Sequence, residues 1–493
     1  ETLSVGRKII IVCSLCMCTL VAAMDQSILT TALPAIAGNF DSASGYSWIG
    51  SAYLLMSAAF LPSWGKLSDI FGRKPVLLTA SGIFMIGSII CGASPNIGVL
   101  IFGRVVQGLG AGGSFGLVNL TISDIVAPRD RGFYLSFVGL TWTLASCLGP
   151  ILGGAFTQEV SWRLCFWINI PIGGLAMIGL MLFLHLDSPK ISIRDGMKMI
   201  DWSGSFFCVA GTTLFLVSME FGGIYYSWSS PMVIGCLIGG IISLGIFVWV
   251  EVKHAKHPIM PMRLFSTKNN IACYLVDLFH GIVFMGATYF LPLFFQASRA
   301  ASPLMSGVYI FPYLVTSSVL STCTGWLTTK TGRVREWIWL GMLFLTLGCG
   351  LTIDLKRTSN WGKMIMYQAI TGAGTAPNFQ SPLLAIQATV PASDLATATA
   401  TYMFIRNIAS ALGVSLGLVV FQNAMAEQHR HLAHHLGNDA AKIISGEYAS
   451  SSVDYIRDLP PHQRDIARDA YSVGLADMWM FYLGCAVAGL IAS

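Results

Sequence analysis

The stretch GKLSDIFGRK, residues 65–74, is a short basic segment punctuated by glycines between two long apolar runs. A second copy, GWLTTKTGRV, occupies residues 325–334, so that G-x-L and G-R recur at a constant offset of 260 positions. A repeat on this scale in a strongly apolar chain indicates a membrane protein built from two similar halves. The copies differ at one informative position, because Asp69 in the first corresponds to Thr329 in the second.

The composition is that of a protein that crosses the membrane many times. Of 493 residues, 54% are hydrophobic and only 11% are charged, against about 25% charged in typical soluble proteins. We count fourteen apolar runs, called spans 1 to 14 in chain order, which begin near residues 9, 46, 76, 98, 133, 164, 202, 231, 271, 304, 336, 364, 397 and 473. Runs of this length form helices in lipid, because a helix satisfies its own backbone hydrogen bonds. The sequence therefore predicts an all-α polytopic membrane protein with fourteen transmembrane helices.

Basic residues mark one side of the membrane. Of the 29 Lys and Arg residues, 17 fall in the N-terminal segment and in alternate loops, whereas the short loops on the other side hold five. The positive-inside rule places the N-terminus in the cytoplasm, and an even number of spans returns the C-terminus there. Basic residues scattered beside spans give no indication of nucleic-acid binding. We expect the plasma membrane as the location, with the vacuolar membrane as the alternative.

A second alignment divides the chain. At an offset of 264, five residues coincide with an identical residue: Gly108, Gly110, Asp130, Gly149 and Gly153 correspond to Gly372, Gly374, Asp394, Gly413 and Gly417. Spans 2 to 5 therefore resemble spans 10 to 13, which is a shift of eight spans. Two six-helix halves separated by two extra helices would produce that shift. Because the shift of eight spans is even, the repeat is parallel. We divide the chain into a half at 1–186, an insert with linkers at 187–262 and a half at 263–493.

These segments carry a family resemblance. GKLSDIFGRK resembles the signature loop of the major facilitator superfamily, GRVVQGLGAG (103–112) its span-4 motif, and GPILGG (149–154) its antiporter motif in span 5. MDQSILTTALPAI (24–36) and WRLCFWINIPIG (162–173) are similar to the fourteen-helix drug:proton antiporter branch, and the whole chain to fungal toxin-efflux members. The resemblance implies a major facilitator fold and proton-coupled antiport that exports small amphipathic compounds.

Asp25 and Arg104 are the leading candidates for proton coupling. An ionisable residue at a helix centre costs about 2.5–3.5 kcal/mol. Asp25 lies about 16 residues into span 1 and Arg104 about 6 residues into span 4 from the other side, so both fall in the outer half of the membrane. An ion pair whose proton affinity changes with conformation is feasible, and the resemblance implicates the corresponding residues in coupling. The alternative is that Asp25 only hydrogen-bonds helix ends and Arg104 only braces the bundle.

The second half of the chain has fewer candidate residues for proton coupling. The position that corresponds to Arg104 is Gln368, which predicts that coupling charge is concentrated in the first half. Asp277 and His280 share a helical face in span 9 and are candidates for a second protonatable site or for contact with a polar substrate. The alternative is a water-solvated pair with no essential role. Arg406 in span 13 is expected to snorkel or to pair structurally.

Two glycine motifs are assigned to gating and packing. In the loop at 65–74, Gly65 and Gly72 permit a tight turn, and Asp69 and Arg73 are predicted to clasp helix ends as a cytoplasmic gate together with Lys74. The alternative is a basic loop that only sets topology. In span 5 the residues predicted to form a close, kinked helix contact are Gly149, Pro150, Gly153 and Gly154.

The substrate cavity is harder to place. Aromatic and polar residues within spans are weak candidates for its lining: Gln26, Trp142, Phe279, Tyr289, Asn378 and Tyr402. The expected partners are a small organic substrate, protons and membrane lipid, and the protein is expected to be a monomer. No nucleotide-binding loop is apparent, so neither ATP nor another cofactor is predicted.

Three other functions are weighed against export. HLAHH (431–435) has the spacing of a di-iron histidine box, but the other histidines are dispersed, so neither an enzyme nor a metal site is predicted. A vacuolar proton-coupled carrier of basic amino acids is the nearest alternative, and many cavity carboxylates would favour it. A non-transporting membrane sensor is the third, and Asp25 and Arg104 argue against it.

Overall fold

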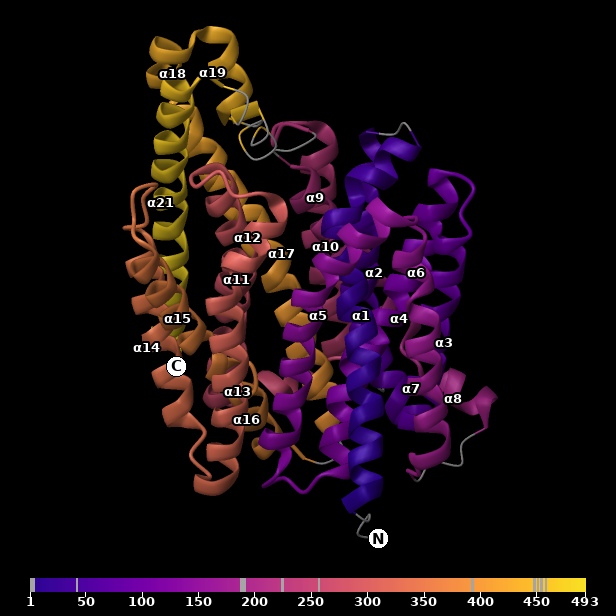
Figure 1. Ribbon diagram of the computed structural model, residues 1–493. Helices are drawn as coiled ribbons and strands as arrows, with labels where there is room; N and C mark the ends of the chain where they lie inside the picture. The colour runs from indigo at the N-terminus through magenta and orange to yellow at the C-terminus, as the bar shows by residue number, and fades with distance from the viewer. Residues whose placement is uncertain are drawn as a thin grey trace.

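The computed structural model is a bundle of long helices that run roughly side by side (Figure 1). It describes residues 5–40, 43–186, 192–222, 226–255, 258–391, 394–446, 449, 452, 455–456 and 459–493. Within these residues the β-structure is limited to one isolated bridge between Gly222 and Tyr226. The prediction of an all-α protein is confirmed.

A first helical group runs from α1 to α7. Its members are α1 (Val5–Asn39), α2 (Ala43–Phe71), α3 (Arg73–Gly92), α4 (Ile97–Ile125), α5 (Arg131–Glu159), α6 (Leu164–Trp167) and α7 (Asn169–Phe183). The next elements are α8 (Ile193–Met199), α9 (Trp202–Phe221), α10 (Pro231–Lys253) and the 3-10 helix η1 (Met262–Phe265). The helices α9 and α10 pack against each other, and α9 also contacts α2.

A second helical group follows η1. Its members are α11 (Lys268–Ala297), α12 (Pro303–Tyr309), α13 (Phe311–Thr331), α14 (Arg335–Thr352), α15 (Trp361–Asn378), α16 (Ser381–Thr389), α17 (Leu395–Glu427), α18 (His429–Leu436), α19 (Asn438–Ile444) and α21 (Pro461–Ala492). Figure 1 shows this group, drawn in salmon to yellow, beside the first group in indigo to magenta.

Local sequence explains where several helices begin. The side chains of Asn96, Ser230, Thr267 and Asn360 accept a hydrogen bond from the third residue of α4, α10, α11 and α15. Such caps satisfy backbone N–H groups that the first helical turn leaves without a partner. Between α2 and α3 the chain turns at Gly72, whose φ of 91° is readily adopted only by glycine.

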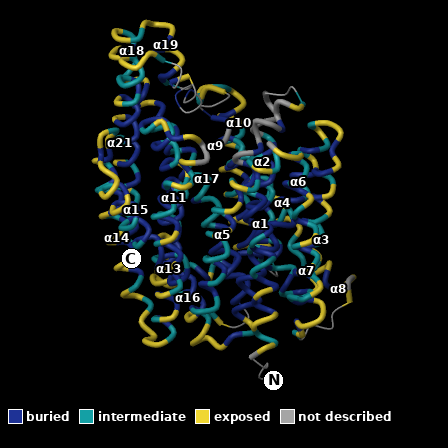
Figure 2. The backbone as a smooth tube through the Cα atoms, viewed as in Figure 1, coloured by how far each residue is buried: buried dark blue, intermediate teal, exposed yellow. Residues whose placement is uncertain are grey.

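The outer surface is apolar, as a lipid-facing surface must be. Ten helical segments in the described chain are long and apolar enough to cross a membrane. Large apolar side chains stand exposed on the outer helices, for example Leu175 on α7 and Ile241 on α10. Figure 2 shows buried positions through the middle of the bundle and exposed positions on outer helices and end loops. The prediction of an integral membrane protein is confirmed.

Equivalent glycine contacts recur in the two helical groups. A Cβ placed on Gly108 would meet the Tyr53 carbonyl, and one placed on Gly372 would lie 2.6 Å from the Tyr313 carbonyl. Tyr53 and Tyr313 are separated by 260 positions, the offset of the repeated loop. The close approach of α2 to α4 in the first group is therefore reproduced by α13 and α15 in the second.

Candidate proton and gating sites

The first site is a buried ion pair between Asp25 on α1 and Arg104 on α4. Both side chains are essentially inaccessible to solvent, and a guanidinium nitrogen of Arg104 donates to Asp25 Oδ2. Arg104 Nε donates to the Ile49 carbonyl at 2.9 Å, and its guanidinium lies 4.3 Å from the ring centroid of Tyr53. The depth argument from the sequence therefore places these two residues together correctly.

Two amides complete the surroundings of Asp25. Gln107 Nε2 on α4 and Asn169 Nδ2 on α7 donate to Asp25 Oδ1 at 2.6 and 2.8 Å. The same two nitrogens donate to Ser88 Oγ on α3, at 2.8 and 3.2 Å. All these partners donate to the acid, so the arrangement suits the ionised carboxylate, which only accepts. Sequence reasoning missed Gln107, although it follows Arg104 by three residues and shares its helical face.

The glycines of span 5 place α1 against α5 beside this network. A Cβ on Gly149 would lie 2.8 Å from the backbone nitrogen of Ile28, three residues after Asp25. Ser27 Oγ donates to the Ala145 carbonyl at 2.8 Å across the same contact. By contrast, a Cβ on Gly154 would meet no atom within 4 Å. Pro150 lies inside α5, and Gly153 is buried on it.

The second helical group holds another buried ion pair. Asp277 on α11 is fully buried, and Arg406 on α17 donates to its Oδ1 from Nε at 2.9 Å and from Nη2 at 2.6 Å. The sequence does not predict this pair: Gln368 at the position of Arg104 indicates that coupling charge is concentrated in the first half, and Arg406 is expected only to snorkel or to pair structurally. No hydrogen bond joins His280 to Asp277 within the described residues, and His280 Nε2 donates to the Thr375 carbonyl at 3.2 Å.

Arg406 also donates hydrogen bonds to backbone carbonyls at the break between α15 and α16. Pro382 has no N–H, so the Asn378 carbonyl cannot receive the usual helical hydrogen bond from four residues later. Arg406 Nη2 donates to the carbonyls of Asn378 and Phe379 at 3.3 and 3.1 Å, and the Tyr402 hydroxyl donates to the same two oxygens. Two predicted cavity residues, Asn378 and Tyr402, therefore meet at this interruption.

The segment 65–74 is mostly helical: residues 65–71 are the end of α2, Gly72 is the turn, and Arg73 begins α3, so the prediction that Gly65 lies in a tight turn is wrong. Its side chains connect several helix ends. Arg73 donates to Asp69 at 2.6 Å and to Asp124 on α4 at 2.9 Å. Asp69 Oδ2 also accepts a hydrogen bond from Thr397 on α17 at 3.3 Å, which joins the two helical groups. Lys74 Nζ donates to the Met181 carbonyl on α7 at 2.8 Å.

At the same end, the contacts between the two groups follow the repeat. A Cβ on Gly65 would lie 2.6 Å from Ala400 Cβ on α17, and one on Gly325 would meet the Gly132 carbonyl on α5. These contacts link α2 to α17 and α13 to α5. Gln387 Nε2 donates to Ser123 Oγ at 3.0 Å, and these residues are separated by 264 positions, the offset of the second alignment. Repeat-equivalent residues that touch each other lie at the axis that relates the two groups.

The remaining predicted cavity residues have different surroundings. Gln26 on α1 is partly buried. The ring of Trp142 on α5 lies 5.1 Å from that of Phe115, within the first group. Phe279 packs against Gly489 on α21, and Tyr289 is 54% exposed. The structure does not gather these four at one place.

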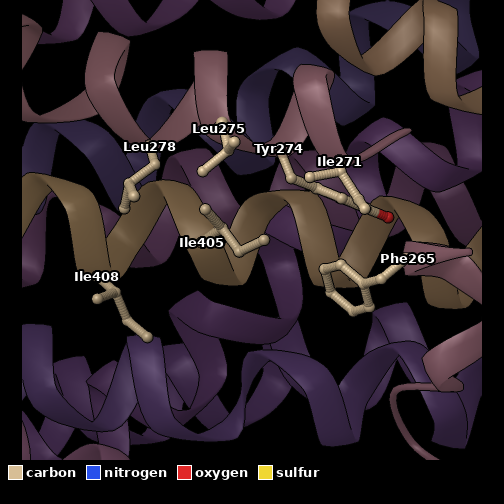
Figure 3. A pocket seen from close by; sticks show the side chains of 7 residues that line it. All are labelled: Phe265, Ile271, Tyr274, Leu275, Leu278, Ile405 and Ile408. Atoms are coloured by element: carbon tan, nitrogen blue, oxygen red, sulfur yellow. The ribbon is translucent and has the colours of Figure 1, made fainter. Parts of the chain in front are cut away.

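An apolar groove of about 320 Å³ lies between α11 and α17. Figure 3 shows its lining, which is Phe265, Ile271, Tyr274, Leu275, Leu278, Ile405 and Ile408. The hydroxyl of Tyr274 is buried there and has no hydrogen-bond partner within the described residues. The groove begins beside η1 and follows α11 for about two turns.

The predicted histidine cluster forms part of α18. The rings of His431 and His434 both lie 4.8 Å from that of His435. Across the described part of the chain, no group of three or more His, Cys, Asp or Glu side chains is arranged to hold a metal ion.

Together, the membrane-length helices, the repeated contacts and the buried ion pairs define a polytopic membrane protein of the transporter class. The chain belongs to the Major Facilitator Superfamily, whose family model matches residues 15–414. It is 46% identical over 481 residues to the efflux pump dotC of Dothistroma septosporum, covering 98% of this chain and 83% of the relative. The family and these relatives are transporters and not enzymes, as predicted.

Two further comparisons, one with a curated relative and one with a solved structure, also identify transporters. The chain is 36% identical to the Acurin A biosynthesis cluster MFS-type transporter of Aspergillus aculeatus, over 96% of this chain and 86% of that protein. Its fold resembles the crystal structure of the human organic anion transporter MFSD10, with a TM-score of 0.61, 14% identity, and coverage of 97% and 99% of the two chains. The resemblance to fungal toxin-efflux transporters is confirmed.

Proposed function

We propose that this transporter is a proton-coupled antiporter that exports small amphipathic organic compounds, such as toxins or secondary metabolites, by alternating access. The observation that carries the proposal is the network around Asp25. Its two oxygens accept from Arg104, Gln107 and Asn169, and a proton that binds Asp25 weakens all three bonds, because the neutral carboxyl is a poorer acceptor and no longer attracts the charge of Arg104. Protonation of Asp25 therefore changes how α1 is held to α4 and α7, which is the link that coupling requires.

The helices fit fourteen spans in a six-plus-two-plus-six arrangement. Pairing α6 with α7, α12 with α13 and α15 with α16 leaves six spans in the first group, α9 and α10 in the insert, and six spans in the second group. This supports the divisions at 1–186, 187–262 and 263–493, with both termini in the cytoplasm. The two groups then rock about the axis between Ser123 and Gln387.

The conformation described is closed at the cytoplasmic side. Hydrogen bonds between the two groups gather at the end that holds the loop at 65–74, including Thr397 to Asp69 and Gln380 to the Leu135 carbonyl at 3.2 Å. In an alternating-access cycle, a state closed on this side is the one in which substrate leaves to the outside and a proton enters from there.

The substrate class follows from charge and from the relatives. Asp25 and Asp277 are each paired with an arginine, which disfavours a basic amino acid as the cargo. The apolar groove between α11 and α17 favours a compound that partitions into lipid. Relatives that are efflux pumps support export across the plasma membrane. We further propose that the protein works as a monomer and that the proton gradient drives export, without ATP or another cofactor.

Proteoliposomes under an imposed pH gradient test the proposal. Aromatic polyketides, lipophilic cationic dyes and lysine should be offered separately, with the gradient in either direction. We expect transport of the polyketides or the dyes to follow the gradient and transport of lysine to be absent. Lysine transport alone would support the vacuolar carrier, and no gradient-driven transport of any compound would support the sensor.

Replacing Gly65 with alanine tests the cytoplasmic gate. The added Cβ would lie 2.6 Å from Ala400 Cβ, so the two helices must separate at a cost of about 1–3 kcal/mol. We expect faster hydrogen exchange at the start of α17 and slower export. Gly50→Ala on the same helix is the matched control, because its Cβ would meet nothing within 4 Å. Equal exchange in the two variants would contradict the role of this contact.

A further inference from the structure

The apolar groove between α11 and α17 has the length of one leaflet of the membrane. It begins beside η1, where Phe265 lines it, and it extends along α11 to Leu278. Leu278 lies ten residues after Lys268, the first residue of α11, which corresponds to about 15 Å along the helix axis. That distance is half of a hydrocarbon core of about 30 Å. In the proposed orientation this half is the cytoplasmic leaflet.

Both walls of the groove belong to the second helical group. The helices α11 and α17 both follow η1, so the groove does not lie between the two groups that rock against each other. A cargo that dissolves in lipid can reach these walls from the bilayer, but rocking does not carry a molecule held within one group across the membrane. The groove therefore suits a resident molecule of the leaflet, which is a phospholipid.

Polarity falls along the groove from η1 inward. Arg263 and Lys268 are exposed at the η1 end. The ring of Tyr274 lies 5.0 Å from that of Phe265, and Figure 3 shows the Tyr274 oxygen at the end that Phe265 and Ile271 line. Beyond this hydroxyl the lining is entirely aliphatic. A phospholipid has the same order of charged head, ester oxygens and acyl chain, and ester oxygens are acceptors that the hydroxyl lacks within the described residues.

Arg263 places a positive charge across the mouth of the groove. Its Nη2 is paired at 2.6 Å with Asp394, the residue immediately before α17. The guanidinium therefore reaches from η1 to the start of α17, while the Arg263 side chain stays 68% exposed. Of the guanidinium nitrogens, only Nη2 has a partner among the residues that the structure describes. The others keep N–H groups that can bind an anion.

The start of α11 adds to this charge. Lys268 is exposed and forms no ion pair with a described residue. It is also the first residue of a 30-residue helix, and the N-terminal end of a helix carries a partial positive charge. The charge of Asp394 offsets that of Arg263, so the mouth of the groove is net positive. The cytoplasmic leaflet is where anionic lipids are concentrated.

We propose that this groove binds one anionic phospholipid of the cytoplasmic leaflet, with its phosphate at Arg263 and Lys268 and an acyl chain along the aliphatic lining. Basic residues between membrane helices on the cytoplasmic side are suited to anionic lipid head groups. The choice of leaflet rests on the orientation given under the proposed function. The site itself requires neither proton coupling nor a cargo.

Native mass spectrometry of the purified full-length protein tests the charge recognition, with phosphatidylserine and phosphatidylcholine of identical chains as probes. We expect the wild type to bind phosphatidylserine more tightly. Lys268→Gln should weaken phosphatidylserine binding about fivefold, as expected for one basic residue near the membrane surface, and leave phosphatidylcholine binding unchanged. Arg333→Gln is the matched control, because Arg333 is 73% exposed in the segment between α13 and α14, away from the groove, and this variant should bind both lipids as the wild type does.

Photocrosslinking places the acyl chain. Phosphatidylserine with a photoactivatable group in one acyl chain should label residues that line the groove, in protein reconstituted without a cargo or a pH gradient. Leu275→Trp adds bulk to the lining and should reduce this labelling. Ile241→Trp changes an exposed apolar residue on α10 and should leave the labelling unchanged.

The outcomes separate the lipid site from the proposed function. Equal binding of the two lipids by the wild type, or labels spread over all the outer helices, would overturn the site, because either result describes the general lipid shell. Unchanged phosphatidylserine binding by Lys268→Gln, with loss of the labels when a transported dye is added, would assign the groove to cargo instead. Failure of gradient-driven transport would overturn the antiport proposal and leave the lipid site standing.

Discussion

Replacing Asp25 with asparagine is expected to abolish export driven by a pH gradient while substrate-for-substrate exchange continues. Asparagine has nearly the same shape but cannot bind and release a proton in this range, and it leaves the buried Arg104 without its counter-charge. Breaking a buried ion pair in this way costs about 3–5 kcal/mol, which corresponds to at least roughly a hundredfold in an equilibrium constant. Gradient-driven export in proteoliposomes should fall to the level of protein-free liposomes.

The control for this variant is another aspartate outside the network. Asp195 on α8 is about two-thirds exposed and pairs with Lys198 at 3.7 Å. Surface ion pairs contribute about 0–1 kcal/mol, so Asp195→Asn should export at the wild-type rate. Undiminished gradient-driven export by Asp25→Asn would remove Asp25 from the mechanism. Loss of exchange together with export would instead indicate a structural role.

The Asp25 network shows what the sequence could and could not predict. Counting residues along two helices of opposite direction places both Asp25 and Arg104 in the outer half of the membrane, at compatible depths. Helical periodicity would also have placed Gln107 beside Arg104. The contact of Asn169 with Asp25 could not be predicted from the sequence, because it depends on how α7 packs against α1. No local sequence pattern indicates that packing.

The second helical group shows why repeats predict the fold better than the site. The glycines at offset 264 recur because helix contacts are repeated, and the structure reproduces them. The buried arginine does not follow the repeat, since it comes from α17 at Arg406, where the first group has Trp142. Ser123 and Gln387 are equivalent in position but not in residue type, so only their contact identifies the axis.

Replacing Gly149 with alanine is expected to destabilise the protein and to impair coupling together. Its Cβ would lie 2.8 Å from the backbone nitrogen of Ile28, which cannot rotate away as a side chain can, so α1 must move. Overpacking of this kind costs about 1–3 kcal/mol. Asp25 lies less than one turn before Ile28 and would move with it, and a displacement of about 1 Å in a reactive site costs roughly a hundredfold in rate. Thermal unfolding and gradient-driven export would measure the two effects.

The companion variant Gly154→Ala distinguishes this contact from a general need for glycine in α5. Its Cβ would meet nothing within 4 Å, so its stability should stay within about 0.5 kcal/mol of the wild type and its export should be unchanged. If the two variants lose stability equally, an effect common to any methyl group added on α5, such as lipid packing, governs α5 and the contact with Ile28 does not. If Gly149→Ala is destabilised but still exports normally, α1 can move without disturbing Asp25, and the link between helix packing and proton binding fails at this contact.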